Sequence, residues 1–477
     1  MLFNKKTKTD KAGEMILSQH ISLSLDTRAT RKNCNTLIVG PAGCAPKAHY
    51  FLPNLLQKNC SYVVVDKEGT LQEQTEQVFR ENGYEVKVLD VAHPETSNKY
   101  NPFSYIREDT DVLGMVDALT KNFTKKGTLV GADLALQCAQ RCLLHAIVFY
   151  LYKECWPSER TLANLVKLLD CAEARANDPD YISALDIIFD NLEATSPDHI
   201  AVLCYRRFKE CHPAAAQKVI VDTKVNLALF KLNRYAELTA TDELDIPSIG
   251  LKPTVLYIKP TITDQWPANR LLLPLFFSQL LETLYFTADT KCEKQRLPVH
   301  VRLMFTNFQS YFAPVGGREF SQHIAIMKPY KISCDLFVHN IEQLKTAFPE
   351  EWKTIVGNYD EVVYLAGGQV LSGEDVEWLS NRFQKDMDRI NKLPIKESIR
   401  KCQKRGIRIL KGAKPLASVE ELTHLKLGDC VVSIRGQMPM VDKVYDPERH
   451  PHYKYVEDAV CKAPDDETTN ADEYPAV

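Results

Sequence analysis

The sequence has no strong excess of charge and no cysteine or histidine pattern of the kind that binds zinc. Its formal net charge of −3 gives no general attraction for nucleic acid, so any such binding must come from a local patch. The 14 cysteines are scattered without a C-x-x-C pair, and the 12 histidines show no zinc-ligand spacing. Reduced thiols in a cytoplasmic protein are therefore expected, and no metal site is predicted.

Long apolar runs are also missing. The longest, Cys142–Tyr152, is interrupted by His145 and is too short to cross a bilayer, so it predicts a buried helix and no transmembrane segment. The chain opens on polar, lysine-rich residues and has no signal peptide. The lysines between Lys5 and Lys11 either form a short arm or contact anionic lipid, which would place the protein at the inner face of the cell membrane.

Runs of β-branched and apolar residues predict a mainly parallel sheet. The helical stretches Lys47–Gln57 and Leu71–Asn82 separate the first three runs, and no strand pattern appears between Glu108 and Glu237. The strand runs are Thr36–Val39, Tyr62–Asp66, Glu85–Asp90, Thr254–Lys259, Val299–Phe305, Ile332–Val338, Glu361–Leu365 and Cys430–Arg435.

This order predicts an α/β fold, a RecA-like parallel sheet flanked by helices, with an inserted all-α domain. The expected divisions are an N-terminal arm (1–32), the first part of the sheet domain (33–107), the helical insertion (108–237), the second part of the sheet domain (238–440) and a partly disordered tail (441–477).

The most informative stretch is Leu37–Ala48, where an apolar strand runs into a small-residue turn and then a helix. That outline is typical of the phosphate-binding loop G-x-x-x-x-G-K-[ST]. Counted from Gly40, however, Ala45 stands at the second glycine, Pro46 at the lysine and Lys47 at the hydroxyl. Proline has no N–H to offer a phosphate, and lysine cannot hold Mg²⁺ as a hydroxyl does.

Shifting the register so that Lys47 is the motif lysine puts Pro46 at the second glycine and Ala48 at the hydroxyl, so neither register restores the motif. Gly40 and Gly43 either keep a phosphate contact or only permit a tight turn. Lys47 is either a phosphate ligand or a lysine on a helix surface. After the next strand, Asp66 and Glu68 are either displaced catalytic carboxylates or a helix cap in a solvated loop.

Seven further stretches occur in an order and spacing shared with one protein family. They are Val63–Gly69, Asn98–Phe103, Asp198–Ala201, Leu297–Arg302, Asn340–Lys345, Thr354–Asn358 and Arg435–Pro439. From about Asn33 to Lys454 the sequence resembles the TraG/TraD-type coupling proteins of conjugative type IV secretion.

The resemblance implies a hexameric ATPase at the inner membrane, which recruits a relaxase–DNA complex and feeds it to the secretion channel. It also implicates the helical domain in the choice of that cargo. Members of the family usually begin with transmembrane helices, which this sequence lacks, so membrane anchoring is not implied.

The residues that carry the family's chemistry are altered here. The resemblance places the second acidic motif at Thr306 and Asn307, the arginine finger at Lys328, and a polar sensor pair at His339 and Asn340. An amide cannot accept a proton as a carboxylate does, and lysine lacks the planar fork of arginine. His339 is either a packing residue or an acid–base group.

One basic segment near the C-terminus contains no acidic residue and either tracks a nucleic-acid backbone or is a solvated connector. Its cations are Arg400, Lys401, Lys404, Arg405, Arg408 and Lys411.

The sequence therefore predicts a non-catalytic relative of the coupling ATPase, with no catalytic residue and no cofactor. Its expected partners are the relaxase, the secretion channel and an active coupling paralogue, with single-stranded DNA and a hexameric ring as further expectations of the resemblance. The alternative is a working ATPase with ATP and Mg²⁺, whose groups have moved to Lys47, Lys328 and Asp66.

Overall fold

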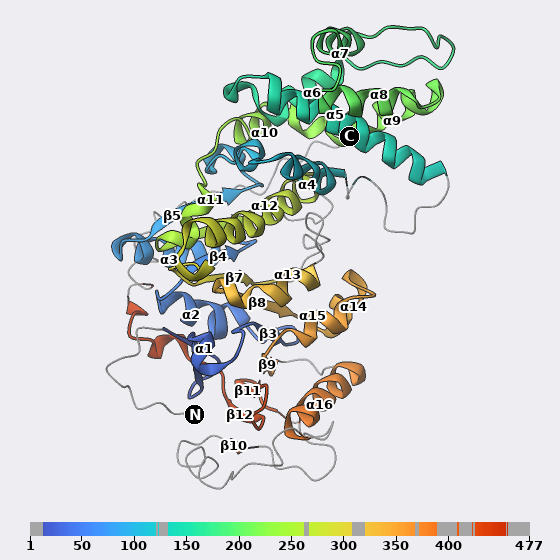
Figure 1. Ribbon diagram of the computed structural model, residues 1–477. Helices are drawn as coiled ribbons and strands as arrows, with labels where there is room; N and C mark the ends of the chain where they lie inside the picture. Colours follow the sequence, from blue (N-terminus) through green and yellow to red (C-terminus); the bar gives the residue numbers. More distant parts are fainter. Residues whose placement is uncertain are drawn as a thin grey trace, which may run out of the picture.

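The computed structural model describes residues 13–120, 123, 132–261, 267–307, 320–367, 372–388, 408–409, 422, 425–454 and 456. Within them a ten-stranded sheet forms the centre, in the order β10-β12-β11-β9-β3-β8-β7-β4-β6-β5 (Figure 1). The strands from β9 to β5 are parallel, and β11, β12 and β10 continue the sheet antiparallel. Their bounds are β3 Thr36–Val39, β4 Ser61–Val65, β5 Glu85–Asp90, β6 Thr254–Lys259, β7 Val301–Phe305, β8 Ile332–Val338, β9 Glu361–Leu365, β10 Arg408–Ile409, β11 Asp429–Ile434 and β12 Met440–Lys443.

Alternate side chains of the strands enter two different cores, as the two-residue period of a strand requires. Leu37 and Val39 of β3 belong to one apolar cluster and Ile38 to the other. On the Ile38 face lie η1 (Lys47–Phe51), α2 (Leu52–Leu56) and α3 (Thr70–Glu81). On the opposite face lie α11 (Ile246–Leu251), α12 (Pro267–Lys291), α13 (Phe320–Ile326), α14 (Ile341–Ala347), α15 (Trp352–Gly357) and α16 (Gly373–Asp388).

The helical domain lies beyond the β5 end of the sheet, at the top of Figure 1. Its helices are α4 Asp109–Thr120, α5 Ala132–Glu154, α6 Leu162–Asp170, α7 Ala184–Thr195, α8 Ile200–Lys209, α9 Pro213–Asn226 and α10 Asn233–Leu238. The predicted parallel sheet with a helical insertion after its third strand is confirmed. The end of this domain is not one continuous helix, because the backbone leaves helical angles at Leu227 and again at Leu232.

The two ends of the chain contribute more to the fold than the sequence predicts. The expected N-terminal arm is wrong for residues 13–32, where β1 (Glu14–Ile16) and β2 (Ser22–Ser24) form a hairpin before the short helix α1 (Thr27–Thr30). Met15 and Leu17 are buried in the same core as Ile38. The Ser18 hydroxyl donates to Asp442 Oδ2 at 2.7 Å, so β12, at the start of the expected tail, holds this hairpin.

Among the residues that the structure describes, two helices are long and apolar enough to cross a membrane by length and composition, α5 over Asp133–Glu154 and α12. The most apolar window of α12 is 83% buried inside the fold and that of α5 is 50% buried. Burial of α12 against the sheet explains its apolar composition, since a core helix needs the same residues as a spanning one.

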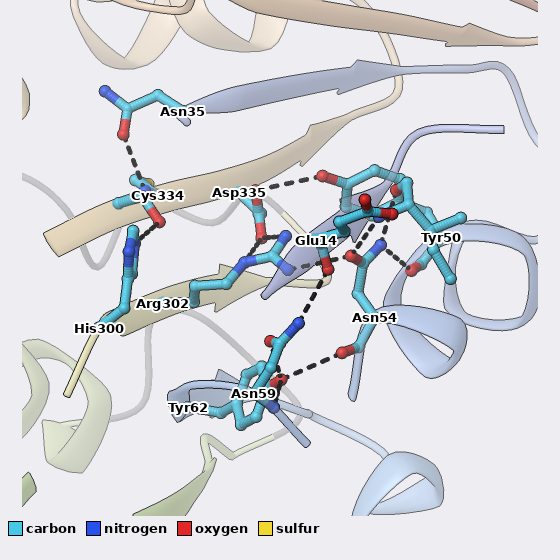
Figure 2. A network of polar contacts seen from close by, with 12 residues as sticks. Glu14, Asn35, Tyr50, Asn54, Asn59, Tyr62, His300, Arg302, Cys334 and Asp335 are labelled. Carbon is cyan, nitrogen blue, oxygen red and sulfur yellow. Dashed lines mark hydrogen bonds and ion pairs between the residues drawn. The ribbon is translucent and has the colours of Figure 1, made fainter. Parts of the chain in front are cut away.

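A buried polar network connects the hairpin, α2 and the middle of the sheet (Figure 2). Arg302 in β7 and Asp335 in β8 have no exposed surface, and the Arg302 Nη2 lies 2.5 Å from Asp335 Oδ2. Arg302 Nη1 donates to Asn54 Oδ1 at 2.9 Å, and the Tyr50 hydroxyl donates to Asp335 Oδ1 at 3.2 Å. Asn54 Nδ2 in turn donates to the Ile16 carbonyl at 2.8 Å. The network thereby fixes η1 and α2, the helical segment that follows the loop at Gly40.

Removing one charge of this pair should destabilise the protein strongly, because the other charge stays buried without its partner. We expect Asp335→Ala to lower the free energy of unfolding by roughly 3–5 kcal/mol. The double variant Arg302→Met with Asp335→Leu should lose much less, since it leaves no buried charge. Urea denaturation followed by circular dichroism measures both. Equal losses in the single and double variants would contradict a stabilising charge pair.

Glu361, at the start of β9, is a second buried group on this face of the sheet. It has no exposed surface, and neither carboxyl oxygen has a hydrogen-bond partner among the described residues. Burial, and then the neighbouring Asp360, raises the pKa of Glu361 well above its usual value of 4.5, with Asp335 acting in the same direction and Lys32 and Arg435 opposing it. The native state therefore keeps a proton that the unfolded chain loses.

A raised folded-state pKa on an acid means that stability falls as the pH rises above the unfolded value of about 4.5. We expect Glu361→Gln to match the parent protein near pH 4.5 and to be more stable at pH 7 by roughly 1–3 kcal/mol. Urea midpoints measured between pH 4.5 and pH 8 test this. Parallel pH profiles for the two proteins would show that Glu361 does not hold the proton.

Candidate functional site

The parallel strands bring most of the predicted site residues to one edge of the sheet. Gly40 follows β3, Asp66 follows β4, Thr306 follows β7 and His339 follows β8, each at the carboxyl end of its strand. Because these strands are neighbours in the order β3-β8-β7-β4, the four residues line one edge, where ligands bind in open parallel sheets.

The loop after β3 is packed tightly on its own neighbours. A Cβ atom on Gly40 would lie 2.6 Å from Cys44 Sγ and 2.9 Å from the Leu365 carbonyl oxygen. A Cβ on Gly367, which the sequence did not mark, would lie 2.8 Å from Pro41 Cγ. Both glycines are therefore required by close approach of the loop to the end of β9. The turn interpretation of Gly40 has a direct steric reason.

The loop turns through two residues with positive φ, although its side chains differ from those of the motif. Gly43 has φ +83° and Ala45 has φ +46°, the left-handed region that glycine adopts without strain. Ala45 thus holds a glycine-like conformation at the position of the second motif glycine. Pro46 follows with helical angles, immediately before η1, and presents no N–H at the position of the motif lysine.

Within the loop Gly40–Lys47, only Lys47 has a charged side chain. Its ammonium group is paired with carboxylates of the same chain. Its ammonium lies 2.6 Å from Asp66 Oδ1, contacts Glu68 Oε2, and donates to the Thr70 hydroxyl at 3.0 Å. The Lys47 side chain is 24% exposed, and Asp66 is fully buried. The sequence named Lys47, Asp66 and Glu68 separately, and their pairing and the role of Thr70 appear only in the structure.

Asp66 serves two structural purposes at once. Its Oδ2 accepts hydrogen bonds from the backbone N–H groups of Leu71 at 2.7 Å and Gln72 at 3.2 Å, at the N-terminus of α3. Its Oδ1 binds Lys47. A carboxylate is favoured at a helix N-terminus by the dipole and the free N–H groups. Both oxygens are thus occupied, and the helix-cap interpretation describes what Asp66 does.

The residues at the second acidic motif contain no carboxylate. Thr306 is 4% exposed. Its hydroxyl donates to the Val65 carbonyl at 2.7 Å, which connects the end of β7 to the end of β4. Asn307 is the last described residue after β7 and is partly buried. Neither side chain can act as the base that a carboxylate provides.

The sensor pair has a structural role at the start of α14. The Asn340 side chain accepts a hydrogen bond from the Gln343 N–H at 3.0 Å, and the His339 N–H donates to Gln343 Oε1 at 2.9 Å. The His339 ring packs edge-on against Phe337, with centroids 4.9 Å apart. Asn340 is thus the N-cap of α14, and Gln343 reaches back to the residue before it, which resembles a capping box.

Lys328 lies apart from these residues. It precedes β8, at the amino end of the strands, and its ammonium donates to the Arg31 carbonyl at 2.8 Å. Lys328 and Lys47 are therefore at opposite edges of the sheet within one chain. Of the predicted basic segment, Arg408 lies in the short strand β10. Arg400, Lys401, Lys404, Arg405 and Lys411 fall outside the described residues.

Comparison with known proteins identifies relatives of this arrangement. The sequence model of the type IV secretory system conjugative DNA transfer family matches residues 5–441. No curated protein matches by sequence.

Solved structures of a bacterial conjugative coupling protein, TrwB, share the fold. Its unbound monoclinic form has a TM-score of 0.59 at 14% identity, covering 91% of this chain and 89% of that chain. Its complex with the non-hydrolysable ATP analogue ADPNP has a TM-score of 0.59 at 12% identity, covering 93% and 90%. At such identity the likeness shows the fold alone, and the predicted RecA-like sheet with its helical domain is confirmed.

The steric account of the loop makes a prediction for two glycines. We expect Gly40→Ala to lower the free energy of unfolding by roughly 1–3 kcal/mol, because the new methyl meets a backbone oxygen that cannot move away easily. Gly114→Ala, in α4, is the matched control, since nothing lies within 4 Å of its added Cβ. The control should gain about 0.5–1 kcal/mol from helix propensity. Thermal unfolding of the two variants tests the difference, and equal behaviour would contradict it.

Proposed function

The chain belongs to the type IV secretory system conjugative DNA transfer family, and we propose that it is a non-hydrolysing coupling subunit of a conjugative transfer apparatus. The observation that carries the proposal is the state of the loop lysine. Lys47 binds Asp66 and Glu68 through its ammonium, so the positive charge of the loop is neutralised inside the chain.

Phosphoryl transfer requires positioned phosphates, a metal, an oriented water and a cation for the developing charge. A triphosphate that approached this loop would meet two carboxylates around Lys47, and like charges at such distances repel. It would also find Pro46 where a backbone donor and an ammonium belong. The motif lysine is therefore absent, and the one lysine of the loop is already paired with carboxylates of the chain.

The described residues of this site also offer no free carboxylate as a ligand for Mg²⁺ or as a base for the attacking water. Mg²⁺ favours carboxylate oxygens beside the phosphates, and Asp66, the buried carboxylate that binds the loop lysine, uses both of its oxygens for Lys47 and α3. The Thr306 hydroxyl donates its hydrogen bond to the Val65 carbonyl. A missing general base alone costs roughly 10²–10⁴ in rate. These contacts support the prediction from the sequence that no cofactor binds.

The rival hypothesis is an active ATPase built from Lys47, Asp66 and Lys328. Within one chain Lys328 lies at the amino edge of the strands, bound to the Arg31 carbonyl, whereas Lys47 lies at the carboxyl edge. The set is not assembled in a single subunit. Nothing in its geometry favours the rival over a protein that keeps the scaffold for binding.

A subunit of this kind would act through its surfaces. The intact sheet provides the body for contact with copies of the chain or with an active coupling paralogue, and the helical domain provides a separate module for relaxase or single-stranded DNA cargo. The TrwB relatives were solved with ADPNP and with ADP and Mg²⁺, so that protein binds nucleotide at its own site. In our proposal this chain has kept the fold and lost that ligand.

Titration with a fluorescent ATP analogue and Mg²⁺ tests the proposal. We expect no saturable Mg²⁺-dependent binding at the loop and no phosphate release, so Lys47→Ala should change neither signal. Saturable Mg²⁺-dependent binding that Lys47→Ala abolishes would establish the rival hypothesis.

A reconstituted loop provides the positive control. The variant Ala45→Gly, Pro46→Lys, Lys47→Thr and Thr306→Asp restores the motif lysine, its hydroxyl and one metal carboxylate, and it also frees Asp66. We expect it to bind the analogue at least about tenfold more tightly than the parent chain. No gain would mean that more than these four side chains keeps nucleotide out.

A further inference from the structure

We propose that a second site, a cavity at the amino edge of the parallel strands, binds a small anion with two or more linked phosphate groups. The cavity has a volume of about 880 Å³ and lies among residues that precede β4, β7 and β8. It is therefore at the opposite edge of the sheet from the loop at Gly40. The proposal is independent of whether that loop binds nucleotide.

The charge of the cavity is the first argument. Five basic side chains line it, against two acidic ones, Asp26 and Glu293. Asp26 already caps α1, where its Oδ1 accepts the N–H groups of Arg28 at 2.9 Å and Ala29 at 3.1 Å. The basic residues are Arg28, Lys291, Lys294, Arg296 and Lys331. An excess of cations in a concave site attracts anions and focuses their field.

The contacts of the two innermost cations are the second argument. Arg296 Nη2 donates to the Thr27 hydroxyl at 2.7 Å, while its Nε is buried without a hydrogen-bond partner among the described residues. The Lys331 ammonium donates only to a neutral group among the contacts described, the Pro298 carbonyl at 2.8 Å. A buried donor that forms no hydrogen bond costs free energy, and an anion in the cavity would accept that hydrogen bond.

The cations also repel one another. Burial, and then the charges of Arg296 and Arg28, lowers the pKa of Lys331. Burial, and then Arg28, lowers the pKa of Arg296 in the same way. Asp26 opposes this repulsion at both residues, and a polyvalent anion in the cavity would offset it further.

The backbone holds these side chains in place. Lys294 and Gln295 have φ +59° and +53°, and Lys331 has φ +63°. Residues with side chains rarely adopt the left-handed region, and such strain persists where the surrounding structure fixes it, commonly at binding sites. Here three such residues lie at or beside the cavity wall. The turn Glu293–Gln295 presents Lys294 and Arg296 from one side, and Lys331 faces them from the strand β8 side.

The chemistry of the wall favours phosphate groups over bases. No phenylalanine, tyrosine or tryptophan lines the cavity in the part of the chain that the structure describes, so nothing there can stack on a base. The one imidazole, His300, is paired with the Ser333 hydroxyl at 2.8 Å, and burial lowers its pKa to about 3, so it is neutral. Guanidinium and ammonium groups are the ligands that phosphates prefer.

Isothermal titration of the full chain with inorganic triphosphate, without divalent metal, tests the site. We expect saturable binding of one triphosphate per chain that weakens by about tenfold or more in Arg28→Ala with Lys294→Ala. Both residues are exposed, so this variant should fold normally. Lys331→Ala should weaken binding in the same direction. Two matched controls should bind like the parent: Lys167→Ala, an exposed lysine on α6, and Lys47→Ala, at the other edge of the sheet.

The outcomes separate this proposal from the proposed function. Equal affinity for triphosphate and ATP would support recognition of the phosphates, and tighter ATP binding lost in the Arg28 and Lys294 variant would support it as well. No saturable binding, or an equal loss in Lys167→Ala, would overturn the proposal. Loss in Lys47→Ala would assign the anion to the loop. Binding of a single-stranded oligonucleotide without triphosphate binding would replace the small-anion site with a backbone contact.

Discussion

The ion pair between Arg302 and Asp335 is the constraint on which the geometry of this protein depends. Both side chains lie in central strands with no exposed surface, and a charge in such a place is tolerated only when it is paired and hydrogen-bonded. Asn54 and Tyr50 complete that bonding from the helix that crosses the sheet, and Ile16 attaches the N-terminal hairpin to Asn54. The network therefore fixes the position of η1 and α2, the helical segment into which the loop after β3 leads. A buried network away from the loop thus holds the helix that follows it.

This separation of scaffold from chemistry explains how the site residues could change while the fold persisted. In the pair Lys47–Asp66 the lysine binds a carboxylate of the same chain, and that carboxylate also caps α3. Thr306 binds the end of a neighbouring strand, and Asn340 caps α14. Lys47, Thr306 and Asn340 thus each have a structural partner in the chain itself. A polar group that is satisfied internally offers an incoming triphosphate little that the protein does not already supply.

The sequence predicted what depends on local pattern and missed what depends on distant contacts. Buried runs such as Thr36–Val39 matched their strands, because a parallel strand covered on both faces is largely apolar. The hairpin at Glu14–Ser24 was taken for an arm because its strands have three residues each, too few to establish a two-residue period. The pairing of Lys47 with Asp66 and the place of Lys328 could not be read, because both depend on which strands are neighbours. The positive φ of Ala45 left no signal, since alanine gives no sign of a left-handed turn.

The two edges of the sheet differ in how their charges are balanced, and this difference follows from what terminates each strand. At the carboxyl edge the strands lead into helices, whose first N–H groups attract carboxylates such as Asp66, and these then neutralise Lys47. At the amino edge the chain arrives from turns, and the cations Arg296 and Lys331 meet one another with carbonyl and hydroxyl groups as their partners. A fold of this type is expected to bind anions at its carboxyl edge. In this chain the lysine at the carboxyl edge is paired with carboxylates. At the amino edge, basic side chains outnumber acidic ones.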